Sequence, residues 1–171
     1  DALPILSKLS RKIGEALELD HEVLKELETT GLVHDIGKIA IDNTILNKPG
    51  KLTEPEYEVI KKHPEISYHI LKSADGFTRF AEHVLSHHER WDGNGYPRGL
   101  AGEEIPLVAR IITIADAYEA MTAVRPYKES LTHTEAVDEL KRFAGSQFDP
   151  AIVATFEEFC ILEETQGFSG L

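Results

Sequence analysis

Apolar residues recur through nearly the whole chain at the spacing of an amphipathic helix. The first of them are Leu6, Leu9, Ile13 and Leu17, followed by Val23, Leu24 and Leu27. No alternating strand pattern with hairpin turns appears, and no fixed repeat is evident. This periodicity predicts an all-α fold. The 171 residues are enough for one domain with a substantial core, so we expect a compact multi-helix bundle over 1–171.

Local signals place the ends of the second predicted helix. Asp20 precedes its apolar run and belongs to the residue types that cap helix N-termini. Gly37 follows the run, and glycine often ends a helix because it adopts a left-handed conformation without steric cost. We therefore expect Asp20 to cap this helix and Gly37 to end it. His34 and Asp35 would then lie at a helix C-terminus.

Later segments carry similar signals. Thr53 and Glu56 form a capping box with an early proline, which predicts a helix that begins near Glu54. Pro64 disfavours a helical conformation in the residue before it and can open the next helix, so His63 should lie at a junction. Further helices are expected over 77–88 and 107–117, after the capping box 132–135, and after 149–150.

The stretch 91–106 is the most irregular part of the chain. It contains four glycines and two prolines and directly follows the histidine pair His87-His88. Loops longer than about 12 to 15 residues are uncommon in compact domains and are usually functional or disordered. We expect this Gly-rich loop to take part in function.

Charge and composition exclude several classes of partner. A net charge of −12 would repel a nucleic-acid polymer, although a small anionic ligand remains possible if the site gathers local positive charge. The longest apolar stretch, 105–117, is interrupted by Arg110 and Asp116 and is too short to cross a bilayer. A lone Cys160 fits a reducing cytoplasm. The missing initial Met suggests a domain excised from a longer chain, with a sensory or receiver region before it.

Asp116 is the first candidate for chemistry. A carboxylate in an apolar helix costs several kcal/mol in desolvation unless a cation or strong donors meet it. Arg110 lies six residues away and off the same helical face, so it is not the expected partner. A distant basic side chain or a metal ion should therefore face Asp116.

Other residues with metal-binding side chains lie at predicted helix ends, where they can converge from several helices. They are His34, Asp35, His63, His87 and His88. Imidazole and carboxylate without thiolate favour iron, manganese or zinc. The set is too large for one ion, and Asp35 can bridge two through its two oxygens. We therefore expect two or more divalent ions and a water held between them as nucleophile.

Each of these residues also has an ordinary structural interpretation. Taken singly, a buried histidine is more often a hydrogen-bonded core residue than a ligand, and only the six together favour a metal centre. By the same reasoning His21 and His133 are expected in solvent, and His69 at the surface or behind the ligands. His83, one turn before His87, remains a rival ligand.

The order of these motifs resembles that of the HD-GYP family, a branch of the HD phosphohydrolases. Two runs carry the main signatures: His34-Asp35-Ile36-Gly37-Lys38, and the run from His87-His88-Glu89 through Gly95-Tyr96-Pro97. Shorter matches are Ile105-Pro106-Leu107, Ala115-Asp116-Ala117, Arg125-Pro126-Tyr127-Lys128 and Gln147-Phe148-Asp149-Pro150. The resemblance extends over roughly 6–159, far beyond a single short motif.

The resemblance implies an all-helical HD-type bundle and hydrolysis of cyclic di-GMP to pGpG, GMP or both, through a hydroxide that bridges iron or manganese ions. The implied metal ligands are His34, Asp35, His63, His87, His88 and Asp116. The implied catalytic residues are Asp35 and Lys38, and the implied substrate contacts are Lys38, Arg90, Tyr96, Arg125 and Lys128, with Arg90 also shaping the loop.

One position departs from the family pattern. A further histidine of the first helix would fall near Ala2, where this chain has no ligand, so two ions are better supported than three. Two alternatives stay open as a result. The domain could sense cyclic di-GMP, dock a protein partner or form a homodimer, without turnover. It could also be an HD-type phosphohydrolase of another nucleotide, which the intact Gly95-Tyr96-Pro97 disfavours.

Overall fold

A computed structural model describes residues 4–165 of the protein. Within this range the chain is helical and has no β-strand beyond isolated bridges. The predicted all-α fold is confirmed. The α-helices are α1 (Ile5–Ala16), α2 (His21–Val33), α3 (Asn43–Leu46), α4 (Glu54–Ile60), α5 (His63–Ser73), α6 (Ala81–Leu85), α7 (Leu107–Thr122), α8 (His133–Arg142) and α9 (Pro150–Thr165). Short 3-10 helices are η1 (Ile36–Ala40), η2 (Thr78–Phe80) and η3 (Gly102–Glu104).

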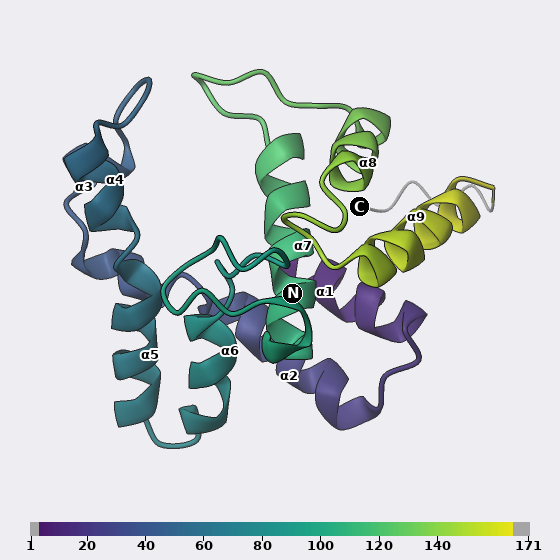
Figure 1. Ribbon diagram of the computed structural model, residues 1–171, viewed down its shortest axis with the longest axis horizontal. Coiled ribbons are helices and arrows are strands. Elements are labelled where there is room, and N and C mark those ends of the chain that lie inside the picture. Colours follow the sequence, from purple (N-terminus) through teal and green to yellow (C-terminus); the bar gives the residue numbers. More distant parts are fainter. Residues whose placement is uncertain (1–3, 166–171) are drawn as a thin grey trace.

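Helix α7 is the centre of the main core, with α1, α2, α8 and α9 around it (Figure 1). Its residues Ile111, Ile112 and Ala115 have no exposed surface, as expected for a helix that is apolar on nearly all sides. Leu9 of α1 and Phe156 of α9 pack into the same cluster. Asp116 is therefore held in a helix that other helices enclose.

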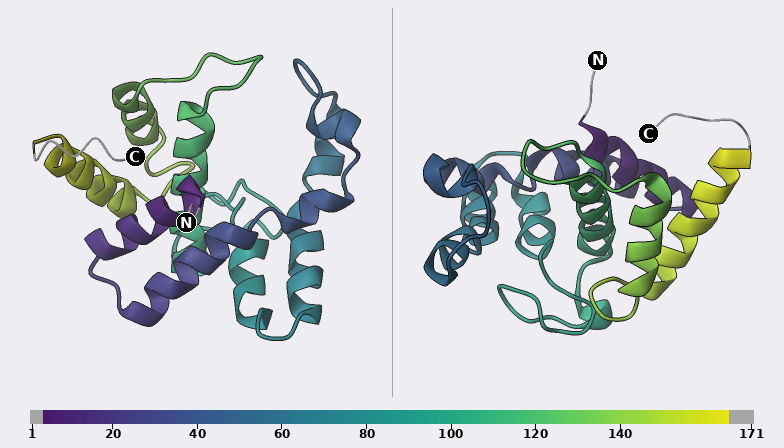
Figure 2. Two further views of the ribbon diagram at one scale, coloured as in Figure 1. Left: turned by 180° about the vertical axis from the view of Figure 1, so that it is seen from behind. Right: turned by 90° about the horizontal axis from the view of Figure 1, so that it is seen from above.

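Helices α5 and α6 form an antiparallel pair that stands beside α2 in the front and back views (Figures 1 and 2). A smaller apolar cluster of Leu71, Phe80, Ala81 and Val84 holds this pair together. Val33, the last residue of α2, packs against the cluster. This contact brings the C-terminus of α2 next to the start of α5 and the end of α6.

The predicted caps are confirmed. The Asp20 carboxylate accepts a hydrogen bond from Val23 N at 3.0 Å and so starts α2. Capping boxes begin α4 and α8, and α5 begins at His63 with a proline in its first turn. Each of these signals acts within one turn of the chain, so the surrounding fold does not override it.

The role predicted for Gly37 is wrong. Helix α2 ends at Val33 without a left-handed glycine, and Gly37 lies inside η1. Its N–H donates to Ser67 Oγ at 2.8 Å, and an added Cβ would lie 2.6 Å from the same oxygen and closer still to the His63 carbonyl. A side chain is excluded here because η1 packs directly on the first turns of α5.

The helix predicted over 77–88 is also shorter than expected. After η2, α6 ends at Leu85, and His87 and His88 lie in the turn that follows. At this end the His87 carbonyl accepts a hydrogen bond from Thr113 Oγ1 of α7 at 2.7 Å. This contact turns the histidine pair toward α7 instead of extending the helix.

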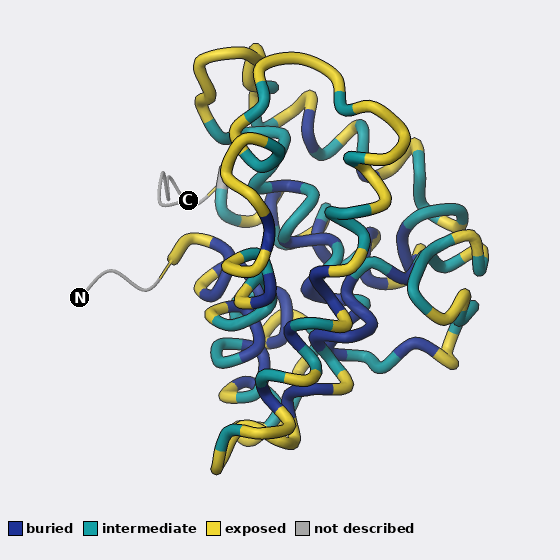
Figure 3. Tube along the Cα trace, turned by 90° about the vertical axis from the view of Figure 1, so that its left-hand side faces the viewer, coloured by how far each residue is buried: buried dark blue, intermediate teal, exposed yellow. Residues whose placement is uncertain are grey.

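Burial follows the same division. The segments that surround α7 are buried, whereas exposed positions run along the loops at the top of the molecule (Figure 3). Those loops include the connection between α7 and α8, residues 123–132. Within residues 4–165, no helix combines the length and the apolar character needed to span a membrane.

Candidate metal centre

The six predicted ligands come from four parts of the chain that the fold brings together. His34 follows α2, Asp35 precedes η1, and His63 opens α5. His87 and His88 follow α6, and Asp116 projects from the middle of α7. The atoms that Asp35, His63, His87 and His88 could offer to an ion all lie within 4.8 Å of one another.

Asp35 lies between two groups of side chains. Its Oδ1 is 3.2 Å from His63 Nε2 and 3.7 Å from His87 Nε2. Its Oδ2 is 3.3 Å from His34 Nε2, and that nitrogen is 3.7 Å from Asp116 Oδ1. The two oxygens of one carboxylate thus face different donor groups, which is the arrangement needed to bridge two ions.

Backbone carbonyls orient three of the imidazoles in the same way. In each case the ring Nδ1 lies at hydrogen-bond distance from the carbonyl oxygen three residues earlier. The pairs are His34 with Gly31 at 2.8 Å, His63 with Ile60 at 2.7 Å and His87 with Val84 at 2.5 Å. A carbonyl oxygen only accepts, so Nδ1 carries the hydrogen and Nε2 of the neutral ring presents a lone pair to the cluster.

Two of these lone pairs face each other with no hydrogen between them. His63 Nε2 is 3.4 Å from His87 Nε2, and two unprotonated nitrogens at this distance repel each other, whereas His88 Nε2, 3.2 Å from His63 Nε2, can donate to it in one tautomer of His88. His34 Nε2 and Asp35 Oδ1 are buried without a hydrogen-bond partner. Buried polar atoms in proteins are nearly always paired. A cation among these atoms would satisfy all of them, so the donor set fits a metal cluster.

Electrostatics in the absence of metal point the same way. Burial opposes ionisation of Asp35, but the neighbouring His34, His63 and His87 outweigh it and hold its pKa far below the usual range. Burial also opposes charge on His34, yet Asp116 and Asp35 raise its pKa to about 10. Without metal, the His34 imidazole is therefore protonated and supplies the positive charge between Asp35 and Asp116. Metal binding would displace this proton.

The expectation for Asp116 is met by the structure. Arg110 turns away and pairs with Asp149 at 2.8 Å. Burial favours the neutral form of Asp116, but His34 outweighs it and lowers its pKa. The positive group that faces the Asp116 carboxylate is therefore His34 of the cluster, not Arg110.

Two of the predicted substrate contacts lie against the cluster. Lys38 Nζ is 2.7 Å from Asp35 Oδ2. The Tyr96 ring stacks on His88, with centroids 5.1 Å apart and planes at 15°, and its backbone N–H donates to the His88 carbonyl at 3.2 Å. The Gly-rich loop thus folds back over a candidate ligand, and an added Cβ on Gly95 would collide with the backbone of Arg90.

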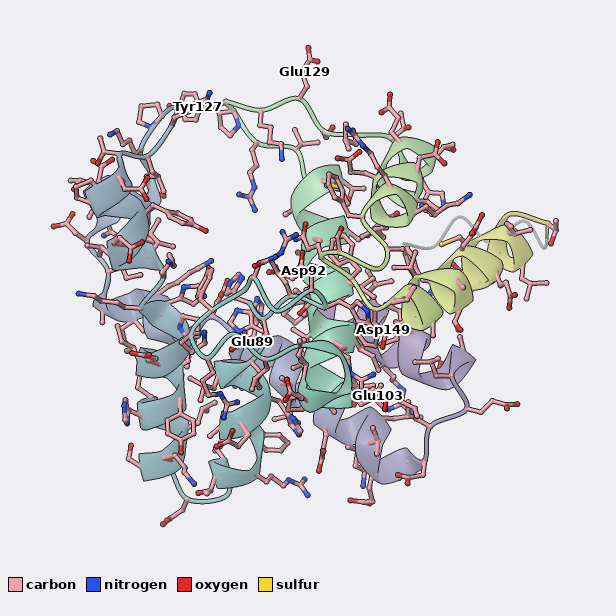
Figure 4. The ribbon with its side chains drawn as sticks, in the orientation of Figure 1. Glu89, Asp92, Glu103, Tyr127, Glu129 and Asp149 are labelled. Carbon is pink, nitrogen blue, oxygen red and sulfur yellow. The ribbon has the colours of Figure 1, made fainter. Side chains whose placement is uncertain are left out.

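The other predicted substrate contacts lie further out. Arg90 donates to the Asp92 carboxylate from Nε at 3.1 Å and from Nη2 at 2.8 Å, so Arg90 shapes the start of the loop. Arg125 and Lys128 pair by a backbone bridge in the exposed α7–α8 connection. This connection, marked by Tyr127 and Glu129 in Figure 4, projects on the same side of the molecule as α3 and α4.

The remaining histidines lie outside the cluster. His83, the rival ligand, pairs with Glu26 at 3.3 Å, while His21 and His69 are exposed. The prediction that His133 is in solvent is wrong: it is half-buried, and its Nδ1 lies 2.6 Å from the Tyr118 hydroxyl, because α8 packs on α7 there. The position near Ala2 lies outside the described residues.

Sequence reasoning missed Glu89. Its side chain is 2% exposed, and its two oxygens accept hydrogen bonds from Arg98 N at 2.7 Å and Leu100 N at 3.0 Å. The sequence does show an acidic residue directly after the histidine pair. No local pattern shows that its side chain points toward the Gly-rich loop. Glu89 ties the Gly-rich loop to the segment that carries His87 and His88 (Figure 4).

Lys61 was missed as well. Its ammonium lies 5.3 Å from the centre of the Tyr96 ring and 5.7 Å from that of Tyr57. The spacing of Tyr57 and Lys61, four residues apart on a helix, is visible in the sequence, but their contact with Tyr96 is not.

Comparison with known proteins agrees with this geometry. A family model described as HD domain matches residues 3–152. A cyclic di-GMP phosphodiesterase response regulator of Xanthomonas campestris pv. campestris is 43% identical over 164 residues, which cover 91% of this chain and 43% of that protein. The 3'3'-cGAMP-specific phosphodiesterase 1 of Vibrio cholerae is 44% identical over 133 residues, which cover 78% and 31%.

The fold comparison gives the same result. The crystal structure of a cyclic GMP-AMP specific phosphodiesterase of Vibrio cholerae aligns with a TM-score of 0.70 at 22% identity, over 91% of this chain and 42% of that one. The chain spans less than half the length of the curated relatives described above. Family model, relatives and shared fold agree with the two signatures around His34 and His87, and the chain belongs to the HD domain family, in its HD-GYP branch.

Proposed function

We propose that this domain is a metal-dependent phosphodiesterase that hydrolyses cyclic di-GMP to pGpG, GMP or both. The observation that carries the proposal is the position of Asp35 between His34 Nε2 on one side and the Nε2 atoms of His63 and His87 on the other. The names of the relatives support the substrate, since they include cyclic di-GMP phosphodiesterases.

The proposed ligands are the six residues His34, Asp35, His63, His87, His88 and Asp116. Nitrogen and oxygen donors without thiolate suit iron or manganese, and the single cysteine, Cys160, is buried in α9, away from this set. A chain with one cysteine cannot form an internal disulfide, which supports a cytoplasmic location. When bound, two or more such ions would supply a nucleophilic water and neutralise phosphate charge.

The side chains around the cluster would place the substrate. Lys38 contacts Asp35 in the free protein and has the reach to turn its ammonium to a phosphate oxygen that arrives beside that carboxylate. Near the reacting phosphate it would neutralise charge or protonate the departing oxygen. Arg125 and Lys128 would hold the other half of the ligand from the α7–α8 connection, since an acidic protein needs local cations to bind a dianion.

The test combines metal analysis with turnover. Purified protein would be loaded with Mn²⁺ or Fe²⁺ and incubated with cyclic di-GMP, and the products separated by chromatography. We expect metal-dependent release of pGpG or GMP that is lost in Asp35→Ala. Bound cyclic di-GMP without turnover in any metal would instead make the domain a sensor, and turnover that survives Asp35→Ala would refute the proposed centre.

A further inference from the structure

Tyr57, Lys61 and Tyr96 form a second group of side chains beside the cluster. Tyr57 lies on α4 and is 43% exposed, Lys61 is the residue that ends this helix, and Tyr96 belongs to the Gly-rich loop. The Lys61 ammonium lies within 6 Å of both ring centres, the range of a cation–π contact. Two segments that are 35 residues apart in the sequence thus meet at one charged atom.

Lys61 keeps hydrogen-bonding capacity in this position. An ammonium has three N–H donors, and Glu58 accepts at 3.1 Å. The two aromatic rings interact with the positive charge through their faces, and a ring face is a weaker hydrogen-bond acceptor than an oxygen or nitrogen lone pair. The side chain is 30% exposed, so a ligand can reach the remaining donors.

The group is placed one aromatic ring away from the proposed metal centre. Tyr96 connects the two, because its ring centre is 5.1 Å from that of His88 and 5.3 Å from Lys61 Nζ. A nucleotide spans a comparable distance between its phosphate and its base. A phosphate at the cluster would therefore bring an attached base toward Tyr57 and Lys61.

We propose that Tyr57 and Lys61 form a subsite for one purine base of a cyclic dinucleotide, in which Lys61 selects guanine over adenine. The selection follows from the edges of the bases. Guanine presents two acceptors, O6 and N7, on the edge where adenine presents an acceptor and the N6 amino donor. A lysine only donates, so it matches guanine and leaves the adenine amino group opposed by another donor. The exposed Tyr57 ring offers the stacking surface.

This inference rests on the proposed function, and its first test is selectivity. Steady-state kinetics would be measured on the whole chain with Mn²⁺ and with cyclic di-GMP or cyclic di-AMP as substrate. Lys61→Met keeps the length of the side chain but removes its donors. We expect KM for cyclic di-GMP to rise on the order of 5- to 150-fold, the usual range for loss of a base-edge contact, with kcat within about twofold. KM for cyclic di-AMP should stay unchanged or fall.

Two further variants separate recognition from structural support. Lys61→Gln should shift preference toward cyclic di-AMP, because an amide pairs with the N6 and N7 edge of adenine. Tyr57→Ala should raise KM for both ligands by similar factors, since stacking does not depend on the identity of the base. If Lys61 only held α4 against the loop, its replacement would raise KM for both substrates equally.

The chain contains a matched control. Lys72 lies 5.6 Å from the centre of the Tyr68 ring, in the same residue types and the same four-residue spacing, but on α5 and without a contact to Tyr96. Lys72→Met should leave KM for both ligands unchanged. Circular dichroism and thermal unfolding would show that each variant is folded.

The outcomes are distinguishable. Suppose that the wild type hydrolyses cyclic di-GMP but that the ratio of its KM values for the two ligands is unchanged in Lys61→Met and in Lys61→Gln. The inference then fails and the proposed function stands. If the wild type hydrolyses neither ligand, the proposed function fails. Dissociation constants of the wild type and Lys61→Met for both ligands then decide the inference, and absence of binding refutes both.

Discussion

Replacing Glu89 by alanine should destabilise the protein well beyond an ordinary surface substitution. The carboxylate is 2% exposed and accepts hydrogen bonds from the backbone amides of Arg98 and Leu100. Hydrogen bonds to a charged group each contribute about 1.5–3 kcal/mol, and removal of the acceptor breaks both bonds at once. We therefore expect the free energy of unfolding to fall by roughly 3–6 kcal/mol.

Urea denaturation measures this change, with thermal unfolding as a second observable. In a domain of this size each kcal/mol lowers Tm by about 2–4 °C, so Glu89→Ala should lower Tm by roughly 6 °C or more. Glu103→Ala is the matched control, because Glu103 belongs to the same loop but is exposed (Figure 4). Equal midpoints for the two variants would refute the reasoning. The denaturant dependence should stay the same in both, since neither change alters the surface exposed on unfolding.

Three further predictions concern metal, packing and capping. Removal of metal with a chelator should lower Tm, and Mn²⁺ should restore it in a concentration-dependent manner in the wild type but not in Asp35→Ala; a Tm that ignores both treatments would contradict the proposed centre. Gly37→Ala should lower the free energy of unfolding by about 1–3 kcal/mol and reduce turnover, because the new methyl group separates η1 from Ser67; unchanged stability by denaturation would refute this packing argument. Thr132→Ala should cost about 1 kcal/mol of stability through loss of a cap while leaving kcat and KM unchanged, and kinetic assays would reveal any effect on the site.

The sequence alone was sufficient for the helical class and the caps, and it supplied the six candidate ligands that stay a proposal. Asp20, Thr53 and Thr132 cap helices in the structure as predicted, because a cap depends on residues within one turn. Asp116 in an apolar helix implied a positive partner, since a buried carboxylate carries the same desolvation cost wherever the chain leads.

Tertiary packing decided the finer points. Helical spacing left His83 as a rival ligand, and only the contact between α2 and α6 pairs it with Glu26. The local pattern around Gly37 resembled a helix end, but a glycine is required here because α5 approaches the backbone too closely for a side chain. In both cases the deciding atoms belong to residues at least 26 positions away, beyond the range of any local signal.

The metal centre shows the same division. The sequence identified six residues that could bind an ion, but it did not reveal that Asp35 lies between the others or that carbonyls point three Nε2 atoms inward. Nor did it reveal that Lys61 reaches Tyr96 across the site. Residue type determines which atoms can bind a cation. Which of those atoms share one point depends on how α2, α5, α6 and α7 pack, and that packing is set by apolar contacts far from the ligands themselves.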